Sequence, residues 1–292
     1  MLVISIRNQS SPKLIKTENM KIIYCNLLFI LVALTSCSSA QKYNDPIPNH
    51  DEFTIESKEV GETRNINVWI PPQYKSSADS FPVMYMADGG IKEEDFPHIA
   101  NTIAELVKSK KIPPIILVGI ANTQRRRDLT GPTEVEKDKE IAPVVGGSAK
   151  FRAFIKEELF PEINKRYRTT NEKSIIGESL SGLFVVETFL LTPEMFDNYI
   201  AFDPSLWWND KSLIKTTKGH LAKFPQTEKR IWFAGSDAKD ISETVRKFSD
   251  LLKAENLPNI KWNYSPEPKE KHNTIFRATK EKALIWTLNK PE

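Results

Sequence analysis

Apolar and polar positions follow two different rhythms in the first half of this chain. Residues 53–56 and 65–70 alternate apolar and polar side chains, the period-two pattern of half-buried antiparallel strands at a sheet edge. Residues 82–87 and 115–121 are continuous apolar runs of strand length, which is typical of central strands buried on both faces. Residues 96–108 between them predict a helix. These patterns indicate a central sheet whose N-terminal strands are antiparallel.

Strands and helices continue to alternate toward the C-terminus. Residues 150–167 carry apolar side chains at close to the spacing of an amphipathic helix. The segment 205–226 is less regular and predicts at most a small lid. The other predicted elements are strands at 174–177, 199–202, 230–234 and 260–264, and helices at 183–191, 241–255 and 274–288. This alternation favours an α/β fold with a mostly parallel central sheet and helices on both faces.

The hexapeptide at 177–182 reads GESLSG and connects a predicted strand to a predicted helix. A serine on such a sharp turn projects from the sheet, and the following backbone amide faces the same space. The pattern is similar to the G-x-S-x-G nucleophile elbow of α/β hydrolases, with Ser181 at the position of the second glycine. Ser179 is therefore the candidate nucleophile. The alternative is an ordinary connection between strand and helix.

A serine nucleophile needs a base, normally a histidine that a carboxylate orients. In α/β hydrolases these residues follow one another in the order serine, acid, histidine. His272 follows a predicted strand and opens the last predicted helix, so it is the candidate base, whereas His220 precedes the expected acid. The acid is expected just after the strand at 230–234, with Asp237 as first choice. The two alternatives for the acid are Asp240 and Glu243, and a site with serine and histidine alone stays open.

Acyl transfer also needs backbone amides that stabilise an oxyanion. The elbow itself supplies the amide of Leu180. The turn at 88–90, which reads DGG and follows the strand at 82–87, is the expected source of a second amide, and Gly90 is the candidate. Glycine there lets the backbone approach a substrate closely.

The N-terminus has the pattern of an export signal. Residues 22–34 form an apolar run of 13 residues after Lys21, which is too short to span a bilayer and is typical of a secretory leader. Met20 is then the expected true start. Residues 34–37 read LTSC and resemble the lipobox of bacterial lipoproteins, which predicts lipidation of Cys37; ordinary cleavage after Ala40 is the alternative. Location in the periplasm or at the outer membrane through a lipid anchor is expected, or secretion as a soluble protein.

Length and composition indicate one domain after this leader. The 292 residues, 40% hydrophobic, divide into an expected leader at 1–36, a tether at 37–50 and a catalytic domain at 51–292. Both cysteines, Cys25 and Cys37, lie in or at the leader, so the domain is expected to use no disulfide, thiol nucleophile or cysteine-bound metal. Neither a cofactor nor a metal is expected.

The charge balance also depends on the leader. Removing residues 1–36 takes four basic residues and one acidic residue from totals of 41 and 38, which leaves 37 of each. A net charge of zero gives no electrostatic case for nucleic-acid binding. The expected partner is a small-molecule ester, and the sequence does not indicate an oligomeric state.

Several stretches together resemble the esterase group of α/β hydrolases, and within it the small periplasmic form of enterochelin (ferric enterobactin) esterases. They are the elbow and residues 118–122, 125–130, 146–151, 157–161 and 203–208, and they run over most of residues 51–285. The resemblance implies the α/β-hydrolase fold, Ser179 as nucleophile and His272 as base. It also implies an aromatic wall at Trp207 and Trp208. Arg125 and Arg127 resemble the family's arginines near the active site; for Arg127, an ion pair with Asp128 or Glu178 is the alternative.

These features favour a serine esterase that forms an acyl-enzyme, with a catecholate siderophore ester as the expected substrate. A feruloyl or acetyl ester on plant polysaccharide is the alternative substrate. The alternative of another class is a surface lipoprotein that binds a ligand without catalysis.

Overall fold

The computed structural model describes residues 45–91 and 95–289. The chain divides into two compact units, Met1–Tyr43 and Asn44–Glu292, and the described residues belong to the second. The predicted leader, the lipobox and Cys37 lie outside the described residues. Within the described ranges, no helix has both the length and the hydropathy needed to cross a membrane.

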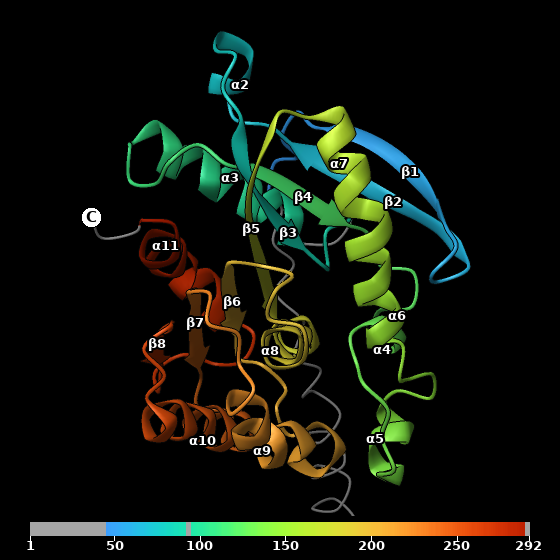
Figure 1. The fold of residues 1–292 in the computed structure, drawn as a ribbon, viewed down its shortest axis with the longest axis vertical. Helices are drawn as coiled ribbons and strands as arrows, with labels where there is room; N and C mark the ends of the chain where they lie inside the picture. The colour runs from blue at the N-terminus through green and yellow to red at the C-terminus, as the bar shows by residue number, and fades with distance from the viewer. Residues whose placement is uncertain (1–44, 92–94, 290–292) are drawn as a thin grey trace, which may run out of the picture. The chain divides into compact units, whose positions relative to one another are not determined.

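Eight strands form a single mixed sheet (Figure 1). The strand order across the sheet is β1-β2-β4-β3-β5-β6-β7-β8. The pairs β1·β2 and β2·β4 are antiparallel, and the other five pairs are parallel. The strands are β1 (Asp51–Ser57), β2 (Glu62–Trp69), β3 (Phe81–Met86), β4 (Ile116–Ile120), β5 (Thr169–Glu178), β6 (Asn198–Phe202), β7 (Lys229–Gly235) and β8 (Ile260–Pro266).

Helices cover both faces of the sheet (Figure 1). On one face lie α3 (Asp95–Lys108) and α11 (Ile275–Leu288), whose apolar side chains form one buried cluster with the sheet. On the other face lie α6 (Ser148–Ala153), η1 (Phe154–Leu159), α7 (Phe160–Arg166), α8 (Leu180–Leu191), α9 (Trp208–Leu221) and α10 (Lys239–Glu255). Three short helices lie in connections: α2 (Gln73–Ser76), α4 (Arg125–Asp128) and α5 (Glu136–Ile141).

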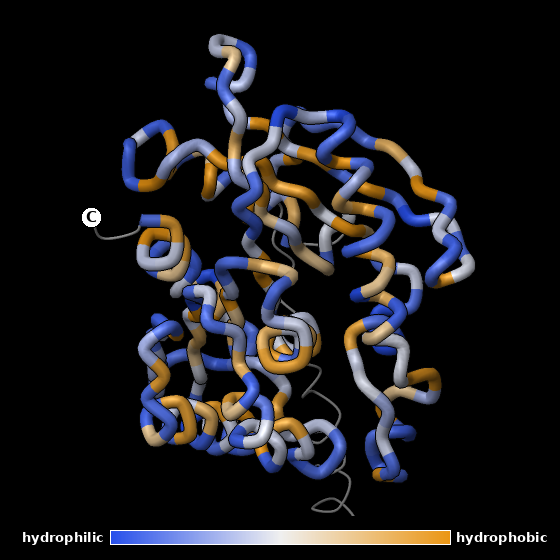
Figure 2. Tube along the Cα trace, in the orientation of Figure 1, coloured by the Kyte–Doolittle hydropathy of each residue, from blue (hydrophilic) through white to orange (hydrophobic). Residues whose placement is uncertain are grey.

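Burial explains why the central strands read as continuous apolar runs. Every residue of β4, β6 and β7 is buried, because helices pack on both faces of these strands. Figure 2 shows hydrophobic stretches along β3, β4 and α8. By contrast, β1 alternates exposed and less exposed residues, as expected of an edge strand with one solvated face.

The predicted fold class and the antiparallel N-terminal strands are confirmed. One difference concerns the segment 205–226, whose less regular pattern predicts no helix and at most a small lid, and which contains α9. The sequence pattern does not reveal this helix, because Asn209, Asp210 and Lys211 near its start all have positive φ, and the regular helical turns begin only after them. A second difference is the predicted helix at 150–167, which consists of α6, a π-helical turn η1 and α7.

Candidate active site

The turn between β5 and α8 holds Ser179 in a strained backbone conformation, with φ 59° and ψ −118°. Its amide donates to the carbonyl of Phe202 (3.0 Å), and its carbonyl accepts from the amides of Leu183 (2.8 Å) and Ser205 (3.1 Å). These bonds tie the turn to β6, to α8 and to the segment after β6. Leu180 begins α8, so its amide, the expected oxyanion donor, lies at the N-terminus of that helix.

Two glycines let α8 pack closely over this turn. A Cβ on Gly177 would lie 2.2 Å from Oγ of Ser181, and a Cβ on Gly182 would lie 3.0 Å from the carbonyl oxygen of Phe202. Ser181 is only 1% exposed, and its hydroxyl has no hydrogen-bond partner within the described residues. Ser181 therefore fits where glycine is usual because Gly177 leaves room for it, at the cost of a buried unsatisfied hydroxyl.

His272 links Ser179 to a buried aspartate. Nε2 of His272 lies 3.1 Å from Oγ of Ser179, and Nδ1 lies 2.7 Å from Oδ2 of Asp203. The side chain of His272, on the loop between β8 and α11, is 43% exposed, whereas the side chain of Asp203 is completely buried. A hydroxyl, an imidazole and a carboxylate connected in this order form the arrangement that activates a serine nucleophile.

Asp203 follows β6 directly, with φ 43°, and its amide donates to the carbonyl of Ala234 in β7 (3.0 Å). Its carboxylate accepts hydrogen bonds from the amide (2.7 Å) and the hydroxyl (2.6 Å) of Ser236. Together with His272, these donors satisfy the buried carboxylate and fix its direction. Asp203 is not among the acids expected from the sequence; its position directly after the predicted strand at 199–202 is the signal that points to it.

Asp203, rather than the expected Asp237, is thus the carboxylate beside the base. Asp237 forms an ion pair with Lys271, while both ring nitrogens of His272 are engaged elsewhere. The reason is local: Ser236 already faces Asp203, and the chain bends at Asp237, whose carboxylate pairs with Lys271. The two alternative acids also lie elsewhere: Asp240 is exposed in the first turn of α10, and Glu243 pairs with Lys211 and Lys247.

The turn after β3 is held against β4. The amide of Gly89 donates to the carbonyl of Ile120 (3.0 Å), and Nδ2 of Asn67 donates to the carbonyl of Gly89 (2.8 Å). A Cβ on Gly89 would lie 2.3 Å from Cα of Gly119, so this approach requires glycine. These contacts fix the turn that carries Gly90, the expected second oxyanion donor.

Arg125 binds this turn through Asp88. Its Nε and NH2 groups donate to the two carboxylate oxygens at 2.5 and 2.8 Å, and Nδ2 of Asn122 donates to the same carboxylate at 2.5 Å. Burial alone would lower the pKa of Arg125, but the bonds to Asp88 outweigh it and raise the pKa. The side chain of Arg125 is still 36% exposed. It can therefore offer its remaining N–H groups to a bound anion while it supports the turn.

Arg127 belongs to a separate ion-pair network. Its Nε donates to Asp128 (2.7 Å), and its NH2 group donates to Glu62 (2.6 Å). The buried Arg64 contacts the same two carboxylates, each at 2.7 Å. The hydrogen bonds to Glu62 and Asp128 raise the pKa of Arg127. These contacts match the ion-pair alternative for Arg127, with Glu62 as the second partner in place of Glu178.

Glu178, next to the nucleophile, is a half-buried carboxyl group. Burial raises its pKa well above the usual range, and the nearby carboxylates of Asp95, Asp203 and Asp88 raise it further. Arg125 opposes this shift. The surroundings of Glu178 therefore favour its neutral form.

The segment after Asp203 passes the nucleophile at Ser205 and then carries two tryptophans. Ser205 lies two residues before Trp207, and its Oγ is 3.5 Å from Oγ of Ser179. Trp208 is 4% exposed, and its Nε1 donates to the carbonyl of Gly131 (3.0 Å). Trp207 is only half-buried, with its ring centroid 5.9 Å from that of Trp208. Trp208 thus anchors the segment, and Trp207 keeps an exposed surface.

Known proteins are similar to this chain in sequence and in fold. Residues 57–279 match the profile of the family described as "Putative esterase". Ferri-bacillibactin esterase BesA of Bacillus subtilis is 31% identical over 185 residues, which are 56% of this chain and 64% of that protein. The siderophore triacetylfusarinine C esterase of Aspergillus fumigatus is 27% identical over 189 residues, 60% of this chain and 62% of that protein. The chain thus spans less than two thirds of the length of these relatives.

A solved structure has a fold similar to that of this chain. The crystal structure of an IroE-like serine hydrolase from Shewanella oneidensis superimposes with a TM-score of 0.75 at 25% identity, and the match covers 82% of this chain and 79% of the other. The family profile covers most of the chain and includes the elbow, Asp203 and His272. The chain is a member of this esterase family and is related to siderophore esterases.

Proposed function

We propose that this protein is a serine carboxylic ester hydrolase that forms an acyl-enzyme on Ser179. The observation that carries the proposal is the continuous hydrogen-bonded path from Oγ of Ser179 through His272 to the buried carboxylate of Asp203. The strained backbone of Ser179 supports it, because strain of this kind is typical of a nucleophile elbow.

In the first half of the reaction, Oγ of Ser179 attacks the ester carbonyl and its proton passes to Nε2 of His272. Asp203 accepts the hydrogen bond from Nδ1, which fixes the tautomer and stabilises the imidazolium. The amides of Leu180 and Gly90 are the proposed donors to the oxyanion, each contributing about 3 kcal/mol. The imidazolium then protonates the leaving alcohol, and the acyl group stays on Ser179.

In the second half, His272 takes a proton from water as the water attacks the acyl carbonyl. The tetrahedral intermediate collapses, and His272 returns the proton to Oγ of Ser179. The carboxylic acid leaves and the free enzyme is restored. The exposed side of His272 gives water access to the imidazole.

We propose a siderophore ester as the substrate. Two relatives carry this activity in their names, as a ferri-bacillibactin esterase and a triacetylfusarinine C esterase. Arg125 supports an anionic substrate such as a ferric catecholate, since arginine is always charged and stacks on aromatic rings. Trp207, half-buried and close along the chain to Ser205, can form an aromatic wall beside the acyl group. A feruloyl ester on plant polysaccharide is the second candidate, because an aromatic acyl group suits the same wall.

The activity is tested on the full-length protein with short p-nitrophenyl esters. Ser179→Ala should reduce the rate to background, whereas Ser181→Ala, a matched change two residues away, should keep the rate of the unmodified enzyme. A fluorophosphonate probe should label the unmodified enzyme and fail to label Ser179→Ala. Full activity in Ser179→Ala would disprove the nucleophile, and lack of both turnover and labelling in the unmodified enzyme would favour a ligand-binding role without catalysis.

The substrate class is tested by comparing kcat/KM on ferric siderophore esters and on feruloyl and acetyl oligosaccharides. The proposal expects the highest values on a ferric siderophore ester. A preference for feruloyl or acetyl esters would overturn the substrate while leaving the esterase mechanism intact.

We also propose that the protein is exported and anchored by a lipid on Cys37, on the basis of the apolar run and the LTSC motif. Labelled fatty acid should be incorporated into the full-length protein in its host and lost in Cys37→Ser. Cleavage after Ala40 with no incorporated lipid would contradict the anchor.

A further inference from the structure

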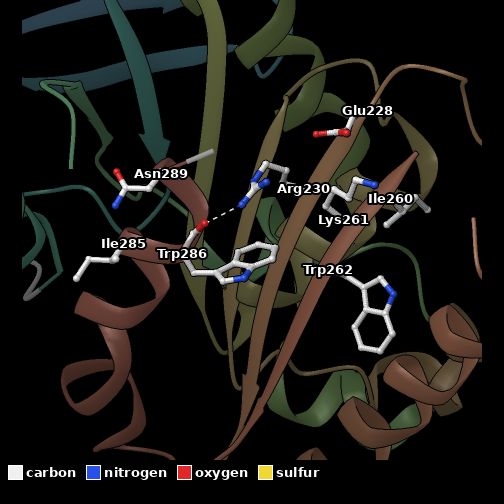
Figure 3. Close-up of a pocket in the computed structure, with 8 residues that line it drawn as sticks. All are labelled: Glu228, Arg230, Ile260, Lys261, Trp262, Ile285, Trp286 and Asn289. Atoms are coloured by element: carbon white, nitrogen blue, oxygen red, sulfur yellow. Dashed lines mark hydrogen bonds between the residues drawn. The ribbon is translucent and has the colours of Figure 1, made fainter. Parts of the chain in front are cut away.

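We propose that a cavity between β7, β8 and the end of α11 is a second binding site, which takes an aromatic carboxylate. The cavity has a volume of about 970 Å³ and is lined by Arg230, Trp286 and Lys261 among others (Figure 3). The volume is within the range of small-molecule sites and much larger than a single inorganic anion requires. The proposal rests on the charge of Arg230 and does not depend on the proposed esterase function.

Arg230 differs from every other buried cation of the described residues. Arg64, Arg152 and Lys229 are buried, and each forms an ion pair with a carboxylate. Arg230 is just as buried, at 6% exposure, but within the described residues no carboxylate pairs with it. An uncompensated buried charge is costly, so the fold leaves a guanidinium that an external anion would stabilise.

The contacts of Arg230 orient its guanidinium without neutralising it. Its NH2 group donates to the carbonyl of Trp286 (2.8 Å), and its Cζ lies 4.5 Å from the centroid of the Trp286 ring. Its Nε is buried and has no hydrogen-bond partner in the described ranges. Figure 3 shows the side chain reaching from β7 toward α11, beside the indole. The NH1 group is not among the buried atoms and has no hydrogen bond within the described residues, so a carboxylate can bond it, and charge-assisted hydrogen bonds of this kind are strong.

The rest of the cavity fits the same ligand. Lys261 lies opposite Arg230 in the register of β7 and β8 and is exposed, so two cations are neighbours on adjacent strands. Glu228 at the rim is exposed and forms no ion pair with either cation among the described residues. Trp286 and Ile285 supply apolar surface for a flat ring. An aromatic ring that carries a carboxylate matches both the pair of cations and the apolar surface.

This site is separate from the esterase site. Arg230 stands near the start of β7, whereas Ser236, which binds Asp203, follows the end of the same strand. Six residues of extended chain separate them by roughly 20 Å. A ligand in the cavity therefore leaves Ser179 and His272 open.

The test measures benzoate and ferulate binding to the full-length protein by calorimetry, after a fluorophosphonate has blocked Ser179. Binding should persist in the blocked protein. Arg230→Gln should weaken it by about tenfold or more, which is the loss expected for a charge-assisted hydrogen bond. Lys261→Gln, an exposed change that cannot disturb the core, should weaken it several-fold, and Lys253→Gln on α10 serves as the matched control without effect.

Hydrolysis of p-nitrophenyl acetate by each unblocked variant should be unchanged, which shows that the variant is folded. No benzoate binding, or equal binding in all variants, would overturn the site. If inorganic phosphate bound as tightly as benzoate, the aromatic ring of the ligand would contribute nothing, and the proposed contact of that ring with Trp286 and Ile285 would be overturned. Binding that occurs only after residues 290–292 are deleted would show that the chain's own tail, which follows Asn289 at the cavity, is the occupant instead.

Discussion

The carboxylate of Asp203 lies 2.7 Å from Nδ1 of His272 and is completely shielded from solvent. Asp203→Asn should therefore lower kcat on p-nitrophenyl esters by about 10³ to 10⁴, because the amide stabilises neither the correct tautomer nor the imidazolium. Asp237→Asn is the matched control. It removes only the partly exposed pair with Lys271, a type of pair that contributes about 0–1 kcal/mol, and should leave kcat unchanged. Rates of both variants on one ester settle which aspartate acts, and a larger loss in Asp237→Asn would reverse the assignment.

Arg125 and Arg127 should respond differently to the same substitution. Arg125→Gln should raise KM for an anionic siderophore ester by about tenfold or more and leave KM for neutral p-nitrophenyl acetate unchanged, since only the former needs the charge. Arg127→Gln should leave both KM values unchanged and lower the melting temperature, because it removes donors from Asp128 and Glu62. An equal rise in KM for both esters in Arg125→Gln would mean that the residue only supports the turn at Asp88.

Burial raises the pKa of Glu178, so the contribution of Glu178 to the stability of the unmodified protein should fall as pH rises. Between the usual pKa of glutamate and the raised value, the folded state keeps a proton that the unfolded state releases, so the free energy of unfolding falls with pH. Glu178→Gln cannot release this proton, and its stability relative to the unmodified protein should grow by about 1.4 kcal/mol per unit of pKa shift. Urea unfolding from about pH 4 to about pH 8 measures this difference.

The control for this series is Glu105→Gln, which changes an exposed glutamate on α3 and should show no such trend. A difference between Glu178→Gln and the unmodified protein that stays constant with pH would show that the pKa of Glu178 is the same in the folded and unfolded states.

Ser181→Ala should stabilise the protein. The substitution removes a buried hydroxyl without a partner in the described residues and keeps the Cβ, so no cavity larger than one atom forms. A gain of about 1 kcal/mol corresponds to a rise in melting temperature of about 2–4 °C. Scanning calorimetry of the variant, with Ser242→Ala as a surface control, measures the rise. A lower melting temperature would mean that the hydroxyl of Ser181 is satisfied.

The sequence predicted most of the fold because its strands carry the signature of burial on both faces. The apolar runs at 82–87 and 115–121 correspond to β3 and β4 within two residues at each end. It did not predict α9, because three residues directly after the first residue of this helix have positive φ, and their conformation depends on contacts distant in sequence. Asn209, for example, is held by Asp138, which lies 71 positions away.

The candidate site could be predicted only in part, for a related reason. Ser179 and His272 each stand at the junction of a predicted strand with a helix, and local pattern is enough to mark them. Choosing among Asp203, Asp237 and other acids requires knowing which loop faces the imidazole, and that depends on how the ends of β6, β7 and β8 come together. The hydrogen bond of Asp203 spans 69 residues, so no local pattern encodes it.

The amide of Ser179 bonds to the last residue of β6, and its carbonyl accepts from Ser205 two residues beyond Asp203. Ser179 and the segment around Asp203 are thereby joined by backbone hydrogen bonds, while His272 lies on a different loop with 43% of its side chain exposed. The imidazole joins them through its two nitrogens, one bonded to Asp203 and the other to Ser179. In the proposed reaction it gives the serine proton to the departing alcohol and later gives a proton taken from water to the serine, so the proton carrier belongs to a separate loop from the two groups between which it works.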